Sequence, residues 1–167
     1  SQMKRIMDIS VALVGLVLSI PLSLVTAIAI KLTSPGHILY QQLRAGLDGK
    51  EYTLLKFRTM CMDAERESGA VWARKADERV TKVGRFLRKW RIEEIPQLLN
   101  VLRGEMSLVG PRPERPEFIE VLAGMIPFYC ERLLVPPGIT GWAQVKFPYT
   151  ASREAAIRKL QYDLYYI

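Results

Sequence analysis

The N-terminal part of the chain is strongly apolar, whereas apolar and charged positions alternate in the rest. From Ile9 to Ile30 the sequence carries no charged residue over 22 positions. An apolar segment of roughly 20 residues is long enough to cross the hydrocarbon core of a bilayer as a helix. Lys4 and Arg5 precede the segment and Lys31 follows it. Positive charge therefore flanks both ends and does not orient a simple membrane span.

Pro21 lies near the middle of this apolar segment. Proline removes one hydrogen bond of a helix and clashes with the preceding turn, and the hydroxyls of Ser19 and Ser23 could satisfy the freed backbone groups. Two structures fit: a helix that breaks at Pro21, enters one leaflet and returns, or a kinked helix that spans the membrane. A cleaved signal peptide fits less well, because the apolar run is longer than a signal core and no small-residue cleavage motif precedes Lys31.

A β-hairpin is predicted next. A short β-prone run, His37–Gln42, and a second run, Glu51–Arg58, flank the turn-forming residues Ala45–Lys50. Because side chains alternate along a strand, Lys56 and Arg58 should share one face. Two neighbouring cations suit a phosphate clamp, but a solvated strand face is the plainer alternative.

Three helices are expected in the remaining sequence. Thr81–Trp90 has apolar residues at helical spacing with basic residues between them, which predicts a basic amphipathic helix at a membrane surface or an ordinary surface helix. A second helix should run from about Glu93 to Arg103 and stop at Gly104. Ala151–Ile167 predicts a third, and the turn-rich stretch Pro136–Val145 ends in an apolar, strand-like run.

Composition narrows the chemistry. The chain has 167 residues, enough for one compact domain, and a formal net charge of +7. That excess favours an anionic partner, which could be nucleic acid, an anionic leaflet or a phosphorylated substrate. Two well-separated cysteines, Cys61 and Cys130, and one histidine, His37, make a zinc site improbable. Carboxylates remain as ligands, and they suit Mg²⁺ or Mn²⁺.

Two features carry candidate chemistry. The adjacent acids Glu93 and Glu94 could serve in catalysis and in cation binding, although acidic residues are also common at helix starts. Gly110-Pro111-Arg112-Pro113 fixes the backbone around one arginine, since each proline locks its own φ and restricts the residue before it. A rigid arginine suits phosphate binding. A purely structural turn is the competing interpretation.

The order of these segments resembles the bacterial sugar transferases, the monotopic polyprenyl-phosphate phosphoglycosyl transferases. The resemblance covers nearly the whole chain, and so many separated matches make it specific. Its strongest parts are Lys4-Arg5 with Asp8, Lys56-Phe57-Arg58-Thr59-Met60, Glu94 with Pro96-Gln97-Leu98, Asn100 through Pro113, Pro137-Gly138-Ile139-Thr140-Gly141 with Ala143-Gln144-Val145, and Tyr162-Asp163-Leu164-Tyr165-Tyr166.

The resemblance implies an α+β fold with a re-entrant membrane helix at residues 1–33, broken at Ser19 and Pro21. Residues 34–167 would form one catalytic domain, with a small β-hairpin and interfacial amphipathic helices, on the cytoplasmic face of the bacterial inner membrane. The implied enzyme transfers a sugar phosphate from a nucleotide diphosphate sugar, by resemblance a UDP-sugar, to polyprenyl (undecaprenyl) phosphate and releases UMP. This is the first membrane step of polysaccharide or glycoconjugate synthesis.

The resemblance also implies roles for individual residues. The family pattern has Asp-Glu where this chain has Glu93-Glu94: the first acid attacks the β-phosphate to form a covalent intermediate, and Glu94 helps to hold Mg²⁺. Candidate phosphate, nucleotide or substrate contacts are Lys56, Arg58, Arg88, Arg112 and Gln144.

The glutamate at position 93 moves the carboxylate by roughly 1.5 Å, and a displacement on the order of 1 Å can reduce a rate about a hundredfold. A weakened or inactive variant is therefore one alternative. Smaller departures are Pro136, where a basic residue is usual, and Ile20, where serine before the proline is frequent.

A rival function is a module that binds anionic lipid through its basic face, with the acids merely capping a helix. Nucleic acid is not expected as a partner, because no recognised binding motif accompanies the charge. The sequence leaves open the sugar, the nucleotide, the pathway, a homodimer, and whether the chain is part of a longer protein.

Overall fold

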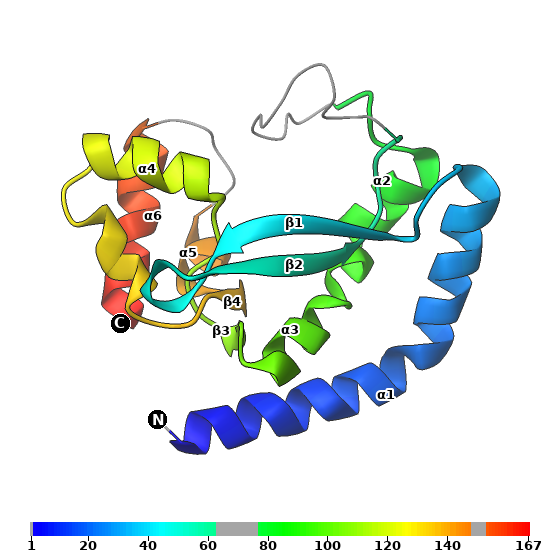
Figure 1. The fold of residues 1–167 in the computed structure, drawn as a ribbon, viewed down its shortest axis with the longest axis horizontal. Coiled ribbons are helices and arrows are strands. Elements are labelled where there is room, and N and C mark those ends of the chain that lie inside the picture. The colour runs from blue at the N-terminus through cyan, green and yellow to red at the C-terminus, as the bar shows by residue number, and fades with distance from the viewer. Residues whose placement is uncertain (1, 63–76, 148–152) are drawn as a thin grey trace.

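The computed structural model describes residues 2–62, 77–147 and 153–167, which form a mixed arrangement of helices and two small sheets (Figure 1). The elements are α1 (Gln2–Thr33), β1 (Leu39–Ala45), η1 (Leu47–Gly49), β2 (Glu51–Phe57), α2 (Lys82–Lys89), η2 (Ile92–Glu94), α3 (Gln97–Arg103), β3 (Ser107–Val109), α4 (Pro116–Met125), η3 (Tyr129–Leu133), β4 (Gly138–Thr140), α5 (Trp142–Lys146) and α6 (Arg153–Tyr166), where η marks a 3₁₀ helix.

The predicted hairpin is confirmed. Strands β1 and β2 pair antiparallel, with Leu39 opposite Phe57 and Ala45 opposite Glu51. The connection uses η1, in which Asp48 adopts a left-handed φ of 55°, a conformation that aspartate tolerates better than most residues. The hairpin crosses the centre of the molecule between α1 and α4 (Figure 1), and it therefore brings residues near the end of β2 to the middle of the structure.

The second sheet is a parallel pair, β3 and β4, in which Ser107 is opposite Gly138 and Val109 opposite Thr140. The two backbone segments pass so close to each other that a Cβ on Gly138 would lie 2.1 Å from the amide nitrogen of Gly110. The strand-like run expected up to Val145 is corrected, because β4 ends at Thr140 and the following residues form the short helix α5.

The helix expected from Glu93 is also corrected. Glu93 and Glu94 belong to the 3₁₀ turn η2, and α3 begins only at Gln97 after Pro96. Proline has no N–H to continue the hydrogen-bond ladder, so the chain makes a separate turn before the helix starts. The predicted stop at Gly104 is confirmed, since this glycine has a left-handed φ of 87°.

Helix α2 matches the predicted basic amphipathic helix. The hydroxyl of Thr81 caps it by accepting a hydrogen bond from the Gly84 amide at 2.9 Å. Leu87 is buried, whereas Phe86 and Trp90 are 57% and 62% exposed. Two of the apolar positions thus face outward instead of the core, and whether α2 lies at a membrane surface stays a prediction.

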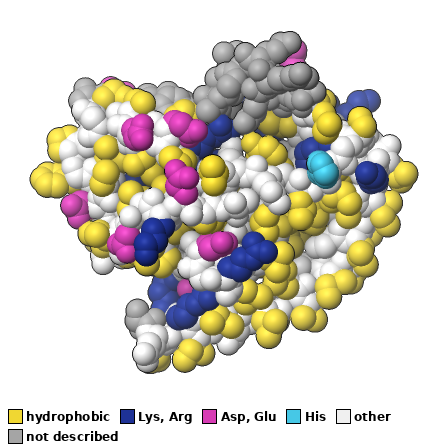
Figure 2. Space-filling model, in the orientation of Figure 1, with side chains coloured by type: hydrophobic (Ala, Val, Ile, Leu, Met, Phe, Trp, Pro, Cys, Tyr) yellow, Lys and Arg dark blue, Asp and Glu magenta, His cyan; other side chains and the backbone are white. Residues whose placement is uncertain are grey.

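Helix α1 is continuous through Pro21, so the predicted break is corrected to a bend, which the ribbon in Figure 1 shows clearly. A proline inside a helix is the usual cause of such a bend. The Ser19 hydroxyl donates to the carbonyl of Leu16 at 3.0 Å. Among the described residues α1 is the single helix long and apolar enough to cross a membrane, and its hydrophobic side chains line the lower and right edge of the molecule (Figure 2).

The N-terminal end of α1 is tied to the rest of the chain by polar contacts. Arg5 donates to the carbonyls of Val101 and Leu102, which are among the last carbonyls of α3. The buried Asp8 accepts a hydrogen bond from the Ser107 hydroxyl at 2.8 Å. This end of the helix is therefore fixed against α3 and β3.

The C-terminal end of α1 packs into the same body. Ile30 forms a buried cluster with Phe57 of β2 and Leu87 of α2. Lys31 donates to the carbonyl of Gly36 at 3.3 Å. Both ends of the apolar helix thus lie against the residues that follow it, while most of the apolar side chains between them are exposed.

Two further clusters hold most of the other buried apolar side chains of the described residues. One joins α1, β2 and α3 under the hairpin, and the other joins α4, η3 and α6 at the far end of β1. Their buried members are Ala12, Tyr52, Leu54, Val101 and Met106 in the first cluster, and Ala45, Ile119, Leu122, Ile126, Tyr129 and Leu160 in the second. Helix α6 confirms the predicted C-terminal helix from Arg153 onward; residues 151–152 lie outside the described part.

Candidate active site

The adjacent acids Glu93 and Glu94 lie on a turn that is held by packing against the core. Arg91, immediately before η2, has a left-handed φ of 58°. Ile92 and Ile95 pack against the buried cluster formed by α1, β2 and α2. Glu93 and Glu94 are only 8% and 7% exposed, so this turn holds two carboxylates that are largely removed from water.

Three cations from different parts of the chain converge on one oxygen of Glu94. Its Oε1 lies 3.1 Å from Nη2 of Arg112, 3.2 Å from Nη1 of Arg91 and 4.0 Å from Nζ of Lys56. Burial alone would raise the pKa of Glu94, but the charges of Arg112, Lys56 and Arg91 outweigh burial and lower it. Glu94 is therefore ionised at neutral pH.

Glu93 has a different environment although it is the next residue. Its Oε2 is buried and has no hydrogen-bond partner among the described residues. Burial raises the pKa of Glu93, and the neighbouring charge of Glu94 raises it further. Two adjacent carboxylates whose pKa values move in opposite directions are typical of acids with different chemical roles.

Lys56 and Arg88 complete the positive surroundings of the two acids. Burial, followed by the charge of Arg112, lowers the pKa of Lys56 to about 7. Nε of Arg88 donates to the Thr59 hydroxyl at 2.9 Å. Burial lowers the pKa of Arg88 and the charge of Glu93 opposes that shift, which places this guanidinium within electrostatic reach of Glu93.

Two of the candidate substrate contacts lie apart from this cluster. Arg58 donates to the backbone carbonyls of Ser34 and Pro35, and it therefore holds the loop that follows α1. Gln144 is on α5, and its Oε1 is buried without a hydrogen-bond partner in the described part of the chain. The structure brings together Glu93, Glu94, Lys56, Arg88 and Arg112; a substrate role for Arg58 or Gln144 stays a prediction.

The carboxylates fit a magnesium ion only in combination with a substrate. Within residues 2–62, 77–147 and 153–167, no group of three or more metal-ligating side chains is close enough to hold an ion. Mg²⁺ is commonly bound by one or two carboxylates together with substrate phosphates. Glu94 would provide the carboxylate of such a site, and the unpartnered Oε2 of Glu93 is on the adjacent residue.

The comparison with known families is decisive. The family model described as "Bacterial sugar transferase" matches residues 1–167, the entire chain. This chain belongs to the bacterial sugar transferase family. The acidic turn, the cations around it and the apolar helix are therefore parts of a sugar transferase.

Three curated relatives of this sugar transferase have names that state an activity. The UDP-N-acetylgalactosamine-undecaprenyl-phosphate N-acetylgalactosaminephosphotransferase of Aeromonas hydrophila is 47% identical over 164 residues, 98% of this chain and 38% of that protein. The UDP-glucose:undecaprenyl-phosphate glucose-1-phosphate transferase of Caulobacter vibrioides is 48% identical over 86% of this chain and 53% of its own length. The enzyme of the same name from Escherichia coli is 42% identical over 99% of this chain and 36% of its own length. The chain thus spans about a third to a half of these relatives.

Sequence reasoning missed two residues of the candidate site. Arg91 is the third cation on Glu94, and its spacing of three residues from that acid was a local signal that could have indicated it. Thr59 orients Arg88 from 29 positions away. No local pattern indicates such a contact, because the approach of α2 to the end of β2 produces it.

Proposed function

We propose that this chain is the catalytic part of a phosphoglycosyl transferase that moves a sugar 1-phosphate from a UDP-sugar to undecaprenyl phosphate and releases UMP. The observation that carries the proposal is the pair of acids: Glu93 has a buried oxygen without a partner, and Glu94 beside it holds three cations. The names of relatives that share 42% to 48% of their aligned residues with this chain support the substrate classes.

Two displacements at phosphorus account for the transfer. In the first, the Glu93 carboxylate attacks the β-phosphorus of the donor, the bond between that phosphorus and the bridging oxygen breaks, and UMP leaves with the oxygen. The sugar phosphate is then attached to Glu93 as a mixed anhydride. In the second, an oxygen of undecaprenyl phosphate attacks the same phosphorus, which forms the lipid diphosphate and frees Glu93. Covalent catalysis of this kind predicts ping-pong kinetics.

The cations on Glu94 provide the groups that bind the donor. The side chains of Arg112, Arg91 and Lys56 are 34%, 62% and 20% exposed, so a diphosphate can reach them from solvent. Positive groups that face the reacting phosphates stabilise the charge of the transition state. Mg²⁺, held by Glu94 and the diphosphate, would supply further charge neutralisation.

The attachment of α1 supports a re-entrant helix. Arg5 and Asp8 fix one end of α1 to α3 and β3, and Ile30 fixes the other end to β2 and α2. A straight helix that spans a bilayer places its ends about 30 Å apart on opposite sides, which is incompatible with two ends packed on one domain. The bent middle would therefore enter one leaflet of the inner membrane from the cytoplasmic face.

A release assay tests the function. The purified protein is mixed with undecaprenyl phosphate, Mg²⁺ and each of a panel of UDP-sugars, and UMP is measured. We expect UMP release with at least one sugar. Glu93→Gln should lose this activity, and the matched control Glu120→Gln, on the exposed side of α4, should keep it. Binding to anionic vesicles without UMP release from this protein or from Glu93→Asp would instead indicate a lipid-binding module.

The membrane topology has its own test. In a variant without Cys61 and Cys130, single cysteines are introduced at Gln2 and Lys31, on either side of the apolar segment. A membrane-impermeant maleimide added to spheroplasts should label neither, and added to inverted membrane vesicles it should label both. Labelling of one position from each side would show a spanning helix and overturn the re-entrant arrangement.

A further inference from the structure

The loop that carries Arg112 connects β3 to α4 without regular secondary structure, and yet four consecutive carbonyls in it accept hydrogen bonds from outside the loop. The carbonyls of four consecutive residues, starting at Pro111, each accept a hydrogen bond from a different donor, two from backbone amides and two from arginine side chains. These bonds are Gly138 N to Pro111 O at 2.9 Å, Arg132 Nη2 to Arg112 O at 2.9 Å, Arg44 Nη1 to Pro113 O at 3.0 Å, and Ala45 N to Glu114 O at 3.1 Å. The loop is thus held by its acceptors, since its two prolines have no N–H to donate.

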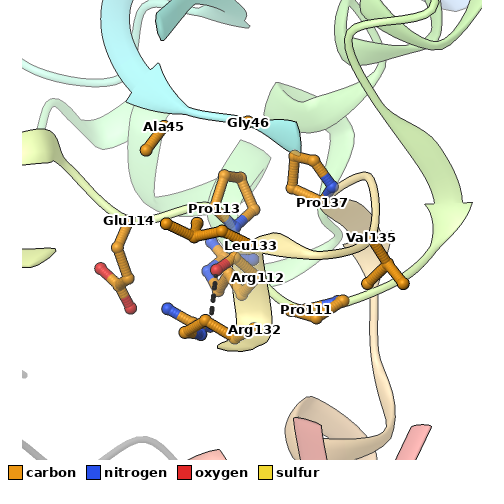
Figure 3. Close-up of a pocket in the computed structure, with 10 residues that line it drawn as sticks. All are labelled: Ala45, Gly46, Pro111, Arg112, Pro113, Glu114, Arg132, Leu133, Val135 and Pro137. Atoms are coloured by element: carbon orange, nitrogen blue, oxygen red, sulfur yellow. Dashed lines mark hydrogen bonds between the residues drawn. The ribbon is translucent and has the colours of Figure 1, made fainter. Parts of the chain in front are cut away.

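The donor to the Arg112 carbonyl is a buried arginine. Arg132, on η3, is 7% exposed and lies beside Arg112 at a small pocket, where the dashed line in Figure 3 marks the contact between them. Its Nε and Nη2 bind Oδ2 of Asp163 at 3.1 Å and 2.8 Å, and Nη1 donates to the Tyr129 hydroxyl at 3.0 Å. Each nitrogen of the guanidinium therefore has an acceptor.

Stability alone does not explain why Arg132 and Asp163 form a buried ion pair. Asp163 on α6 is 3% exposed. Burying two charges removes both from water, and a well-packed apolar pair of the same volume is often equally stable or more stable. An apolar pair could not donate a hydrogen bond to the Arg112 carbonyl. The Arg132 guanidinium does so, and Asp163 holds it in place.

We propose that Arg132, held in place by Asp163, is a positioning residue that fixes the backbone of Arg112 so that the Arg112 guanidinium reaches Glu94. The inference rests on the proposed function. The chain of contacts runs from Asp163 to Arg132, from Arg132 to the Arg112 carbonyl, and from the Arg112 guanidinium to Oε1 of Glu94 at 3.1 Å. Helix α6 thereby acts on the cations around Glu94 through Arg132 and Arg112.

A double substitution separates positioning from stability. Arg132→Met/Asp163→Leu removes both charges together, so it should fold with a melting temperature near that of the parent. It leaves the Arg112 carbonyl without its donor, and kcat for UMP release should fall by about tenfold to a hundredfold, the range expected for a small displacement of a catalytic group. The KM for the UDP-sugar should change less. Tyr129→Phe, which removes a hydroxyl from the same guanidinium but keeps the bond to Arg112, is the matched control.

A comparison of Arg112→Lys in two backgrounds distinguishes positioning from a purely structural role. A purely structural role predicts that the effect of Arg112→Lys on kcat is the same in both. Arg112→Lys should reduce kcat strongly in the parent and only weakly in Arg132→Met/Asp163→Leu, because the second background has already displaced Arg112. Additive effects, or a kcat of the folded double variant within twofold of the parent, would overturn the inference. If the double variant does not fold, Arg132→Lys, which keeps a cation beside Asp163 but has no planar fork to bind both Asp163 and the Arg112 carbonyl, replaces it in the same comparison.

A crystal structure of the double variant tests the inference without any activity. The separation of Arg112 Nη2 from Glu94 Oε1, now 3.1 Å, should lengthen. An unchanged separation would overturn the positioning role, whether or not UMP is released. Failure of the proposed function is recognised separately, by the absence of UMP release from both the parent and Glu93→Asp.

Discussion

Two buried carboxylates of this chain are held by arginine, and they are held in different ways. Asp163 is bound by one guanidinium through two bonds to one oxygen, and both partners of that pair are buried. Glu94 is approached by Arg112, Arg91 and Lys56, and every one of these cations remains partly exposed. The first arrangement is closed to solvent, whereas the second can be reached from it.

The difference indicates which contact is permanent and which can be exchanged. A buried pair can only be broken by leaving a charge without a partner in the interior, which is strongly unfavourable. A partly exposed cation can turn to another anion without becoming an unpaired charge in the interior, and the other two cations then still neutralise the buried Glu94. The Glu94 cluster is thus suited to receive a diphosphate, and the Arg132–Asp163 pair is suited to hold its surroundings still.

The largest expected effects test this contrast directly. Glu94→Gln removes the charge shared by the three cations, and UMP release should fall by about a thousandfold or more, the scale of losing a central electrostatic contact. Its melting temperature should change little, since the cations can turn to solvent. Asp163→Asn should instead reduce the free energy of unfolding by up to about 3–5 kcal/mol, because Arg132 keeps a buried charge without its partner.

Both variants are compared by UMP release and by chemical denaturation under the same conditions. The contrast would be wrong if Glu94→Gln lost more stability than Asp163→Asn. It would also be wrong if Asp163→Asn kept full stability, since the pair would then not be closed to water.

Elements determined by local patterns could be predicted from the sequence. The hairpin follows from two β-prone runs around Asp48-Gly49, and α2 follows from its helical spacing and the capping residue Thr81. The acidic pair and Arg112 stood out because each has an unusual neighbourhood in the sequence. Their proximity to Lys56 agrees with the expected phosphate site.

What the sequence could not indicate depends on tertiary packing. Pro96 is compatible with a helix start, and only the folded chain shows that its missing N–H separates the acidic turn from α3 and that Ile92 and Ile95 hold this turn against a buried cluster. Arg58 was predicted to share a strand face with Lys56, and the sequence did not indicate that its guanidinium donates to the loop after α1. The Arg132–Asp163 pair joins residues 31 positions apart, and no local periodicity connects them.

The next largest expected effect is a change in kcat when Glu93 is replaced by aspartate. Glu93→Asp shortens the side chain by one methylene and restores the acid of the family pattern, so kcat should rise by up to about a hundredfold if the longer side chain misplaces the attacking oxygen by on the order of 1 Å. Single-turnover UMP release and trapping of a labelled phosphosugar on the protein measure the first displacement alone. A lower rate for Glu93→Asp would show that this site is adapted to glutamate.

The pH dependence of kcat/KM tests the cations on Glu94. Lys56, whose pKa burial and Arg112 lower to about 7, is charged below that pH and loses its charge as the pH rises through it. Attraction for the donor diphosphate is lost in the same direction, so kcat/KM should fall about tenfold between about pH 7 and pH 8.5. Lys56→Arg, which keeps its charge over this range, should abolish the fall.

The acid side of the same profile provides an internal check. Burial raises the pKa of Glu93, and its carboxylate must be ionised to attack, so activity should rise with pH through that pKa. Lys56→Arg should leave this rising limb in place. If it removed both limbs, the two titrations would not belong to separate residues.

The smallest effect concerns Arg91, whose side chain is the most exposed of the three cations on Glu94. Arg91→Ala and Arg91→Gly remove the same ion pair, and because such an exposed contact is largely screened, UMP release should fall by no more than about threefold in both. The two variants should differ in stability. The φ of 58° at this position costs an alanine about 1 kcal/mol that glycine does not lose, so chemical denaturation should show Arg91→Gly to be the more stable. A tenfold loss of UMP release in both variants would mean that Arg91 is not an exchangeable contact but a required one, and the distinction between the open and the closed carboxylate would then rest on Arg112 and Lys56 alone.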